Sequence, residues 1–220
     1  MIKSILLAFL IAAATCALTY DKVVLDDPQA KCLDGSPGAY YIWQGDPQKV
    51  LLFIEGGGWC GDNDLGSTTE NCYQRSKTDL GSSTGYKPTQ TFSQGILSDH
   101  PDNYFNNWTR VFLKYCDGSG HQGTRSDPVL YKGAQLFFRG QNITLAQFES
   151  INKSNKIFTN AVTHLVLTGE SAGGLATFQW TNYLASKLAK GTKFWSVPDS
   201  GVFIDETNSL TKVNSYRIWF

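Results

Sequence analysis

The feature that most constrains the fold of this 220-residue chain is a Gly-x-Ser-x-Gly pentapeptide between an apolar run and a helical pattern. Residues 165–168 are Leu-Val-Leu-Thr, and the pentapeptide spans Gly169 to Gly173. A strand, a sharp turn and a helix in this order are typical of a nucleophile elbow, which exposes the serine Oγ. We therefore predict Ser171 as a catalytic nucleophile and the N–H of Ala172, at the helix start, as an oxyanion donor. The alternative is a purely structural turn, since the pentapeptide alone is a weak signal.

Three consecutive glycines follow a second apolar run, residues 51–54. Glycines let several backbone N–H groups converge on one oxygen, because no Cβ atoms obstruct the approach. An acyl-transfer site takes such donors from a glycine-rich turn and from the residue after the nucleophile. The alternatives are a flexible turn before a disulfide, or a phosphate loop, whose Gly-Lys-Ser/Thr sequence is missing. The predicted oxyanion donors are Gly57, Gly58, Trp59 and Ala172.

Apolar runs alternate with helical patterns, which predicts an α/β fold: a mainly parallel sheet flanked by helices. Strands are expected at Ala39–Trp43, Val50–Glu55, Arg110–Tyr115 and His164–Thr168. Helices are expected at Asn142–Asn155 and Gly174–Lys190. Residues 65–101 are rich in Gly, Ser, Thr and Asp, and are expected to form a long loop with one short helix near Thr91–Leu97.

The N-terminus has the pattern of a secretory signal peptide. Lys3 precedes a ten-residue apolar run, and small residues follow it up to Ala17. The run is too short for a transmembrane helix, which needs about 20 apolar residues. We expect cleavage after Ala17, an extracellular protein of residues 18–220, and no membrane span.

Secretion changes the interpretation of the five cysteines, because four remain after loss of Cys16 and oxidising compartments favour disulfides. Cys60 and Cys72 flank a short polar segment and are expected to pair locally, so that Cys32 and Cys116 would close a long loop. No metal site is expected, because no Cys-x-x-Cys or His-x-x-x-His spacing occurs.

The charge balance argues against a nucleic-acid partner, since 19 Lys and Arg face 19 Asp and Glu without a block of one sign. Three Asn-x-Ser/Thr triplets are compatible with secretion and are candidate glycosylation sites. They begin at Asn107, Asn142 and Asn152.

Several motifs together resemble the pectin acetylesterase and Notum carboxylesterase family over roughly residues 30–210. They are Cys32-Leu-Asp-Gly-Ser-Pro, Phe53-Ile-Glu-Gly-Gly-Gly-Trp-Cys60, Tyr115-Cys-Asp-Gly-Ser-Gly120, Gly169-x-Ser-Ala-Gly-Gly174 and Asp199-Ser-Gly-Val-Phe-Ile-Asp205. The resemblance implies an α/β-hydrolase-like domain with a Ser–Asp–His triad and no cofactor. It also implies a carboxylic ester hydrolase that removes acetyl groups from pectin or an acyl group from a lipidated protein.

The chain departs from the family pattern in two ways. Glu170 stands where the family usually has Cys or Ser, and family members continue well beyond this length, with their Asp and His in the later half. Here all three histidines precede Ser171. We therefore expect an incomplete domain, the N-terminal portion of an esterase, that lacks normal turnover by itself.

The roles of the other candidate side chains follow from this order. His121 is a weak candidate for the base, because the base of this fold normally follows the acid. His164 is expected to pack at the start of its strand, Asp117 to organise a loop, and Asp199 to organise a turn near the site.

Three functions remain open: an esterase acting on O-acetylated polysaccharide, a lipid or protein deacylase, and a non-catalytic binding remnant. Exposed Trp residues near Ser171 would favour sugar stacking, whereas an apolar cavity would favour acyl chains.

Overall fold

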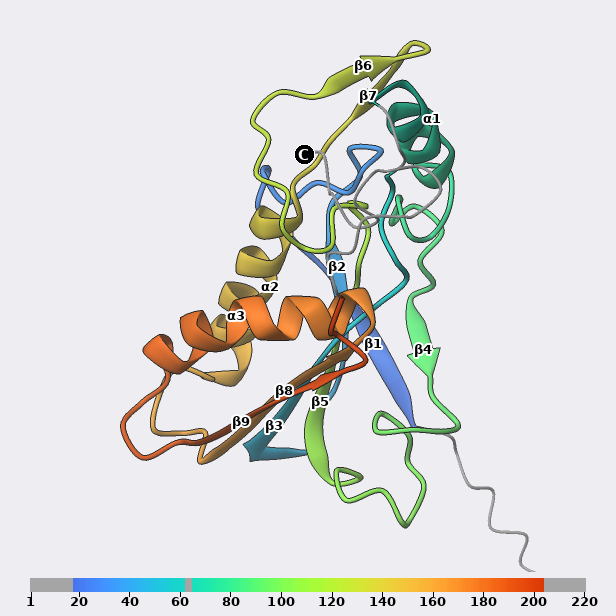
Figure 1. Cartoon of the computed structure of the whole chain (residues 1–220). Coiled ribbons are helices and arrows are strands. Elements are labelled where there is room, and N and C mark those ends of the chain that lie inside the picture. The colour runs from blue at the N-terminus through green and yellow to red at the C-terminus, as the bar shows by residue number, and fades with distance from the viewer. Residues whose placement is uncertain (1–17, 62–64, 204–220) are drawn as a thin grey trace, which may run out of the picture.

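The computed structural model describes residues 18–61 and 65–203. The predicted signal peptide and Asp205 lie outside these residues. Seven strands form one sheet in the order β4-β1-β2-β5-β3-β8-β9, and β6 pairs with β7 in a separate hairpin (Figure 1). The strands are β1 Thr19–Val24, β2 Ala39–Trp43, β3 Asp46–Ile54, β4 Thr89–Thr91, β5 Trp108–Leu113, β6 Val129–Tyr131, β7 Ala134–Leu136, β8 His164–Glu170 and β9 Lys193–Asp199. The helices are α1 Leu65–Arg75, α2 Gly140–Asn155 and α3 Ala172–Lys187.

The half of the sheet that leads to Ser171 is parallel. Strand β3 pairs with β5 on one side and with β8 on the other, and β9 continues beyond β8. Ile54 lies in register with both Leu113 and Gly169, so three strands end side by side. Strands β1, β2 and β4 are antiparallel at the other side of the sheet. The predicted α/β fold with a mainly parallel sheet is confirmed.

The two faces of the sheet are covered by different kinds of structure. Helix α2 packs on the Tyr40 face, where the Tyr40 hydroxyl lies 3.1 Å from the Ser150 hydroxyl. Helix α3 lies beside α2, and Phe148 meets Trp180 edge to face with ring centroids 5.7 Å apart (Figure 1). Successive strand residues face opposite sides, so the next residue, Tyr41, faces the loop segment 76–107. That segment lacks a helix yet provides aromatic packing for the sheet.

The prediction for residues 65–101 is wrong in two respects. Helix α1 occupies Leu65–Arg75, and residues 89–91 form β4 where the predicted short helix would begin. The α1 sequence has few strong helix formers, but Cys72 is buried in a disulfide with Cys60, and α1 contacts β6 and β7. Tertiary attachments of this kind override a weak intrinsic propensity.

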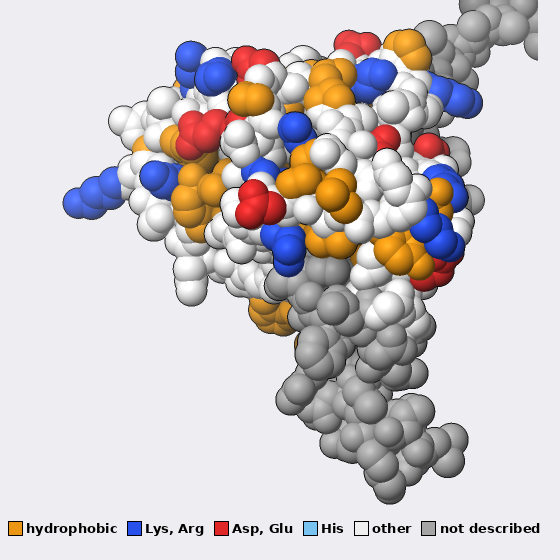
Figure 2. All heavy atoms as spheres, turned by 90° about the horizontal axis from the view of Figure 1, so that it is seen from above, with side chains coloured by type: hydrophobic (Ala, Val, Ile, Leu, Met, Phe, Trp, Pro, Cys, Tyr) orange, Lys and Arg blue, Asp and Glu red, His pale blue; other side chains and the backbone are white. Residues whose placement is uncertain are grey.

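The other predicted elements are present, with boundaries that shift by up to four residues, and Ala39–Trp43 is confirmed to the residue. Strands β1, β6, β7 and β9 were not predicted. Strand β9 lies at the sheet edge, contains Pro198 and alternates exposed with half-buried residues, which makes its apolar signal weak. On the described part of the face in Figure 2, acidic and basic side chains are interspersed with hydrophobic ones.

Candidate active site

Ser171 lies between β8 and α3, at the turn that the pentapeptide predicts. Its backbone has φ 52° and ψ −119°, which is rare for a residue other than glycine. The Ser171 N–H donates to the Asp199 carbonyl oxygen at 3.0 Å, and its carbonyl oxygen accepts from the Leu175 N–H at 2.9 Å in the first turn of α3. Such strained backbone persists only where its surroundings hold it, and it concentrates at functional sites.

The glycines that flank Ser171 are required by close approach of backbone. A Cβ on Gly173 would collide with the Ile54 carbonyl oxygen at the end of β3. A Cβ on Gly169 would lie 2.6 Å from the Gly173 carbonyl oxygen. The elbow therefore packs directly on the end of β3, from which the glycine turn begins.

The glycine turn lies against the residue before Ser171. A Cβ on Gly56 would collide with the Glu170 carbonyl oxygen, so the first glycine is packed on the elbow. Gly57 and Gly58 have φ values of 119° and 62°, and a Cβ on Gly58 would meet nothing within 4 Å. The half-buried Trp59 follows, with its ring 5.0 Å from that of Phe203 in an edge-to-face arrangement. The structure thus brings both predicted motifs together and leaves open space at Gly58.

Glu55, directly before the glycines, is half-buried and pairs with the buried Lys114. Its Oε1 accepts from Lys114 Nζ, and its Oε2 accepts from the Tyr115 N–H at 2.8 Å. Burial raises the pKa of Glu55 above its usual range, although the Lys114 charge opposes that shift. The pair joins the carboxyl ends of β3 and β5, and so fixes the start of the glycine turn.

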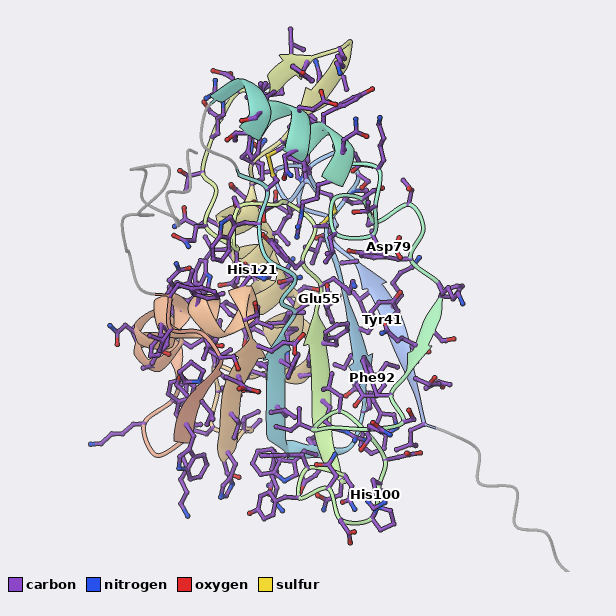
Figure 3. The ribbon with its side chains drawn as sticks, turned by 45° about the vertical axis from the view of Figure 1, so that its right-hand side comes forward. Tyr41, Glu55, Asp79, Phe92, His100 and His121 are labelled. Atoms are coloured by element: carbon purple, nitrogen blue, oxygen red, sulfur yellow. A yellow bond between two sulfur atoms is a disulfide. The ribbon has the colours of Figure 1, made fainter. Side chains whose placement is uncertain are left out.

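The three histidines lie in very different places. His164 begins β8, and His100, labelled in Figure 3, precedes β5. Both therefore lie toward the amino ends of these strands, whereas Ser171 follows the carboxyl end of β8. Six residues of β8 lie between His164 and Ser171, and seven steps of about 3.3 Å give a span of about 23 Å. His164 stacks on Trp195 with ring centroids 5.9 Å apart, which agrees with its expected packing role.

His121 is the histidine near the glycine turn, and Figure 3 shows it close to Glu55. Its Nε2 donates to the Glu55 carbonyl oxygen at 2.9 Å, and its ring stacks on Tyr115 with centroids 4.3 Å apart. Burial lowers the pKa of His121 to about 4. A neutral imidazole that already uses Nε2 for the backbone is a weak general base, so His121 acts as an anchor of the turn.

The two described acidic candidates organise loops. Asp117 is buried and accepts from the Ser119 hydroxyl, whose oxygen accepts in turn from the Gly123 N–H at 2.7 Å. Burial raises the pKa of Asp117 to about 6. Asp199 contributes its carbonyl oxygen to Ser171, while its exposed carboxylate accepts from the Ser200 hydroxyl at 3.0 Å.

The disulfides have the pairing that the sequence favoured. Cys60–Cys72 ties the end of the glycine turn to α1, and Cys32–Cys116 ties the loop before β2 to the segment after β5. Both bridges lie near the carboxyl ends of β3 and β5.

The three candidate glycosylation sites differ in accessibility. Asn107 is exposed in the loop before β5. Asn142 and Asn152 are half-buried in α2, and the side-chain oxygen of Asn152 accepts from the Phe158 N–H at 3.0 Å. Asn107 is therefore the most accessible of the three.

Two further findings concern residues 18–61 and 65–203. Their histidine, cysteine and acidic side chains do not gather in any group of three that could bind a metal ion. None of their helices combines the length and the apolar character needed to cross a membrane.

Comparison with known proteins shows that the pectinacetylesterase family model matches residues 14–220 of the chain. The chain belongs to the pectinacetylesterase family. Pectin acetylesterase 5 of Arabidopsis thaliana is 36% identical over 186 residues, which cover 82% of the chain and 41% of that protein. Human palmitoleoyl-protein carboxylesterase NOTUM is 31% identical over 183 residues, covering 79% of the chain and 34% of that protein. The chain thus spans less than half the length of these two relatives.

A solved structure of a pectinacetylesterase relative supports the fold. The Wnt deacylase Notum from Drosophila superposes with a TM-score of 0.73 at 25% identity, over 86% of the chain and 55% of the Notum chain. The α/β-hydrolase-like fold is therefore shared with a deacylase of known structure.

The sequence patterns did not indicate the side chains that hold the glycine turn in this member of the family. Lys114 and Arg75 are single charged residues without a motif of their own, and α1 was not expected at all. A usable signal was Glu55 itself, because a carboxylate between an apolar strand and three glycines requires a partner if it is buried.

Proposed function

We propose that the chain forms part of a serine carboxylesterase, with Ser171 as the nucleophile. The observation that carries this proposal is the strained Ser171 turn, packed directly against the glycine turn that ends β3. A serine held in this way presents its Oγ at the carboxyl end of a strand, where α/β hydrolases perform acyl transfer. The family relatives named as esterases support the same reaction class.

The proposed reaction proceeds through an acyl-enzyme. The Ser171 Oγ bonds to the ester carbonyl carbon while a general base takes the hydroxyl proton, and the carbonyl oxygen becomes an oxyanion. The Ala172 N–H and the N–H groups of Gly57, Gly58 and Trp59 are the proposed donors to that oxyanion. The alcohol leaves with the proton, and water then attacks the acyl-enzyme to release the acid and restore Ser171.

The base and its acidic partner are proposed to come from family sequence beyond the part matched here, since the relatives are about twice as long or longer. The His121 Nε2 donates to the Glu55 carbonyl oxygen, and His100 and His164 lie toward the amino ends of β5 and β8, away from Ser171. Without a base the serine keeps its proton and is a poor nucleophile near neutral pH. The chain alone is therefore expected to react slowly.

The proposed substrate is an extracellular acetylated polysaccharide. The identity to pectin acetylesterase 5 exceeds that to human NOTUM, 36% against 31%. Trp59 beside the glycine turn offers an aromatic surface of the kind that sugars stack on. Two disulfides and the signal-peptide pattern support secretion. The second candidate is deacylation of a lipidated protein, which the Notum fold favours.

A labelling experiment tests the nucleophile. A fluorophosphonate probe should modify the 220-residue chain at Ser171 slowly, over prolonged incubation, as mapped by peptide mass spectrometry, and should leave Ser171→Ala unmodified. Equal labelling of both proteins would overturn the proposal. Hydrolysis of p-nitrophenyl acetate against p-nitrophenyl octanoate then separates the two substrate classes, with the acetate expected to react faster.

A further inference from the structure

We propose that Arg75 is a positioning residue of this site, whose guanidinium sets the direction of the Gly58 N–H. The inference rests on the proposed function, because that direction matters only if the glycine turn binds an oxyanion. Arg75 ends helix α1, the helix that also carries Cys72.

The Arg75 side chain is held at several points. Its Nη1 donates to the Gly57 carbonyl oxygen at 3.0 Å, and its Nε donates to the Leu80 carbonyl oxygen at 3.1 Å. Its guanidinium carbon lies 5.0 Å from the centre of the Tyr115 ring, within the range of a cation–π contact. A planar guanidinium bound to two carbonyl groups has little freedom to turn.

Peptide geometry passes this constraint to the next N–H. In a trans peptide the carbonyl oxygen of Gly57 and the N–H of Gly58 point in opposite directions, and no described peptide bond is cis. Two successive glycines adopt many backbone conformations, so the peptide between them needs an external restraint. Arg75 holds the carbonyl on the α1 side, which turns the N–H away from α1.

The ends of the turn are fastened separately. His121 holds the Glu55 carbonyl group, and the Cys60 N–H donates to the Gly118 carbonyl oxygen at 2.9 Å. Cys72, bonded to Cys60, lies three positions before Arg75, so both side chains share one face of α1. Helix α1 thus holds the turn through a covalent bond at its end and a charged hydrogen bond at its centre.

The first test measures the rate of Ser171 labelling by an alkyl fluorophosphonate, whose phosphoryl oxygen occupies the place of an oxyanion. Arg75→Ala is expected to slow labelling about ten- to a hundredfold. This is less than the ~10²–10³-fold loss of rate that follows complete removal of one oxyanion donor. Arg75→Lys should be intermediate. The matched control is Gln74→Ala, which changes the neighbouring α1 residue and loses exposed contacts with Glu70 and Lys77. Urea unfolding of each variant identifies any loss of folded protein.

The second test measures the ¹⁵N–¹H residual dipolar coupling of Gly58, which reports the direction of that N–H. It should change in Arg75→Ala and Arg75→Lys but not in Gln74→Ala. Labelling of Arg75→Ala within threefold of wild type, or slower labelling with an unchanged Gly58 coupling, would overturn the inference. If wild type is not labelled at Ser171 even after prolonged incubation, the proposed function fails. The Gly58 coupling then decides alone whether Arg75 orients the turn.

Discussion

The N–H of Ser171 donates to the carbonyl oxygen of Asp199 across 3.0 Å, and this bond joins the elbow to the last residue of β9. Asp199 therefore supports the elbow through its backbone, while its carboxylate is exposed and contacts Ser200. The Ser171 conformation depends on a neighbouring strand as well as on its own flanking glycines.

Ser171→Gly should be more stable than Ser171→Ala. Both variants lack the hydroxyl, but alanine keeps a Cβ at φ 52° whereas glycine tolerates that angle. The expected difference in the free energy of unfolding is about 1 kcal/mol. Urea titration measures it, and equal stability of the two variants would show that the turn carries no such strain.

Gly173→Ala should disrupt the packing between the elbow and β3. Its Cβ would collide with the Ile54 carbonyl oxygen, and backbone cannot move aside as a flexible side chain can. The expected loss of stability is at least about 3 kcal/mol, the upper range for overpacking. Gly61→Ala is the matched control, since its Cβ would meet Trp59 at 3.6 Å, an ordinary contact. Similar unfolding midpoints for the two variants would contradict the prediction.

Replacing either member of the Glu55–Lys114 pair should lower the free energy of unfolding. Replacing Glu55 should lower it more than replacing Lys114. Glu55→Gln leaves the Lys114 ammonium buried without its charge partner, which costs about 3–5 kcal/mol. Lys114→Met should cost less, because the pKa of Glu55 is already raised and its carboxyl group can take up a proton. The double variant should be more stable than the sum of the single effects implies. A double-mutant cycle by urea unfolding measures this, and strict additivity would exclude the coupling.

The pH dependence of stability should contain two opposing contributions. The pKa of His121 falls from 6.5 unfolded to about 4 folded, so stability is lost as pH falls from about 6.5 to 4. The pKa of Asp117 rises from 3.8 unfolded to about 6 folded, so stability is lost as pH rises from about 4 to 6. Each contribution amounts to about 3 kcal/mol, and in the wild type they largely cancel.

Two variants separate these contributions. Relative to wild type, His121→Gln should gain stability as pH falls from 6.5 to 4, because only the Asp117 contribution remains. The Gln side chain can still donate to the Glu55 carbonyl oxygen. Asp117→Asn should lose stability as pH falls over the same interval, because only the His121 contribution remains. Unfolding free energies at pH 6.5, 5 and 4 provide the comparison, and a variant whose curve stays parallel to wild type refutes the assigned pKa of the residue it replaces.

The fold was predictable where local pattern and tertiary environment agree. The apolar runs that become β3, β5 and β8 are buried on both faces, so their sequences carry a continuous signal. Helix α1 and strand β9 carry weak signals, because one depends on a disulfide and the other lies exposed at an edge. The two motifs around Ser171 and the glycines were recognisable for a local reason, since sharp turns and close backbone approach demand glycine.

The sequence by itself determined the α/β class, the elbow at Ser171, the glycine turn before Cys60 and the favoured cysteine pairing. Each of these depends on residues within one short segment or on simple spacing. Only the tertiary structure decided that Glu55 pairs with Lys114, that His121 anchors a carbonyl group, and that Arg75 contacts Gly57. Those contacts join residues 18 to 66 positions apart, and the direction of a side chain across such distances is set by packing.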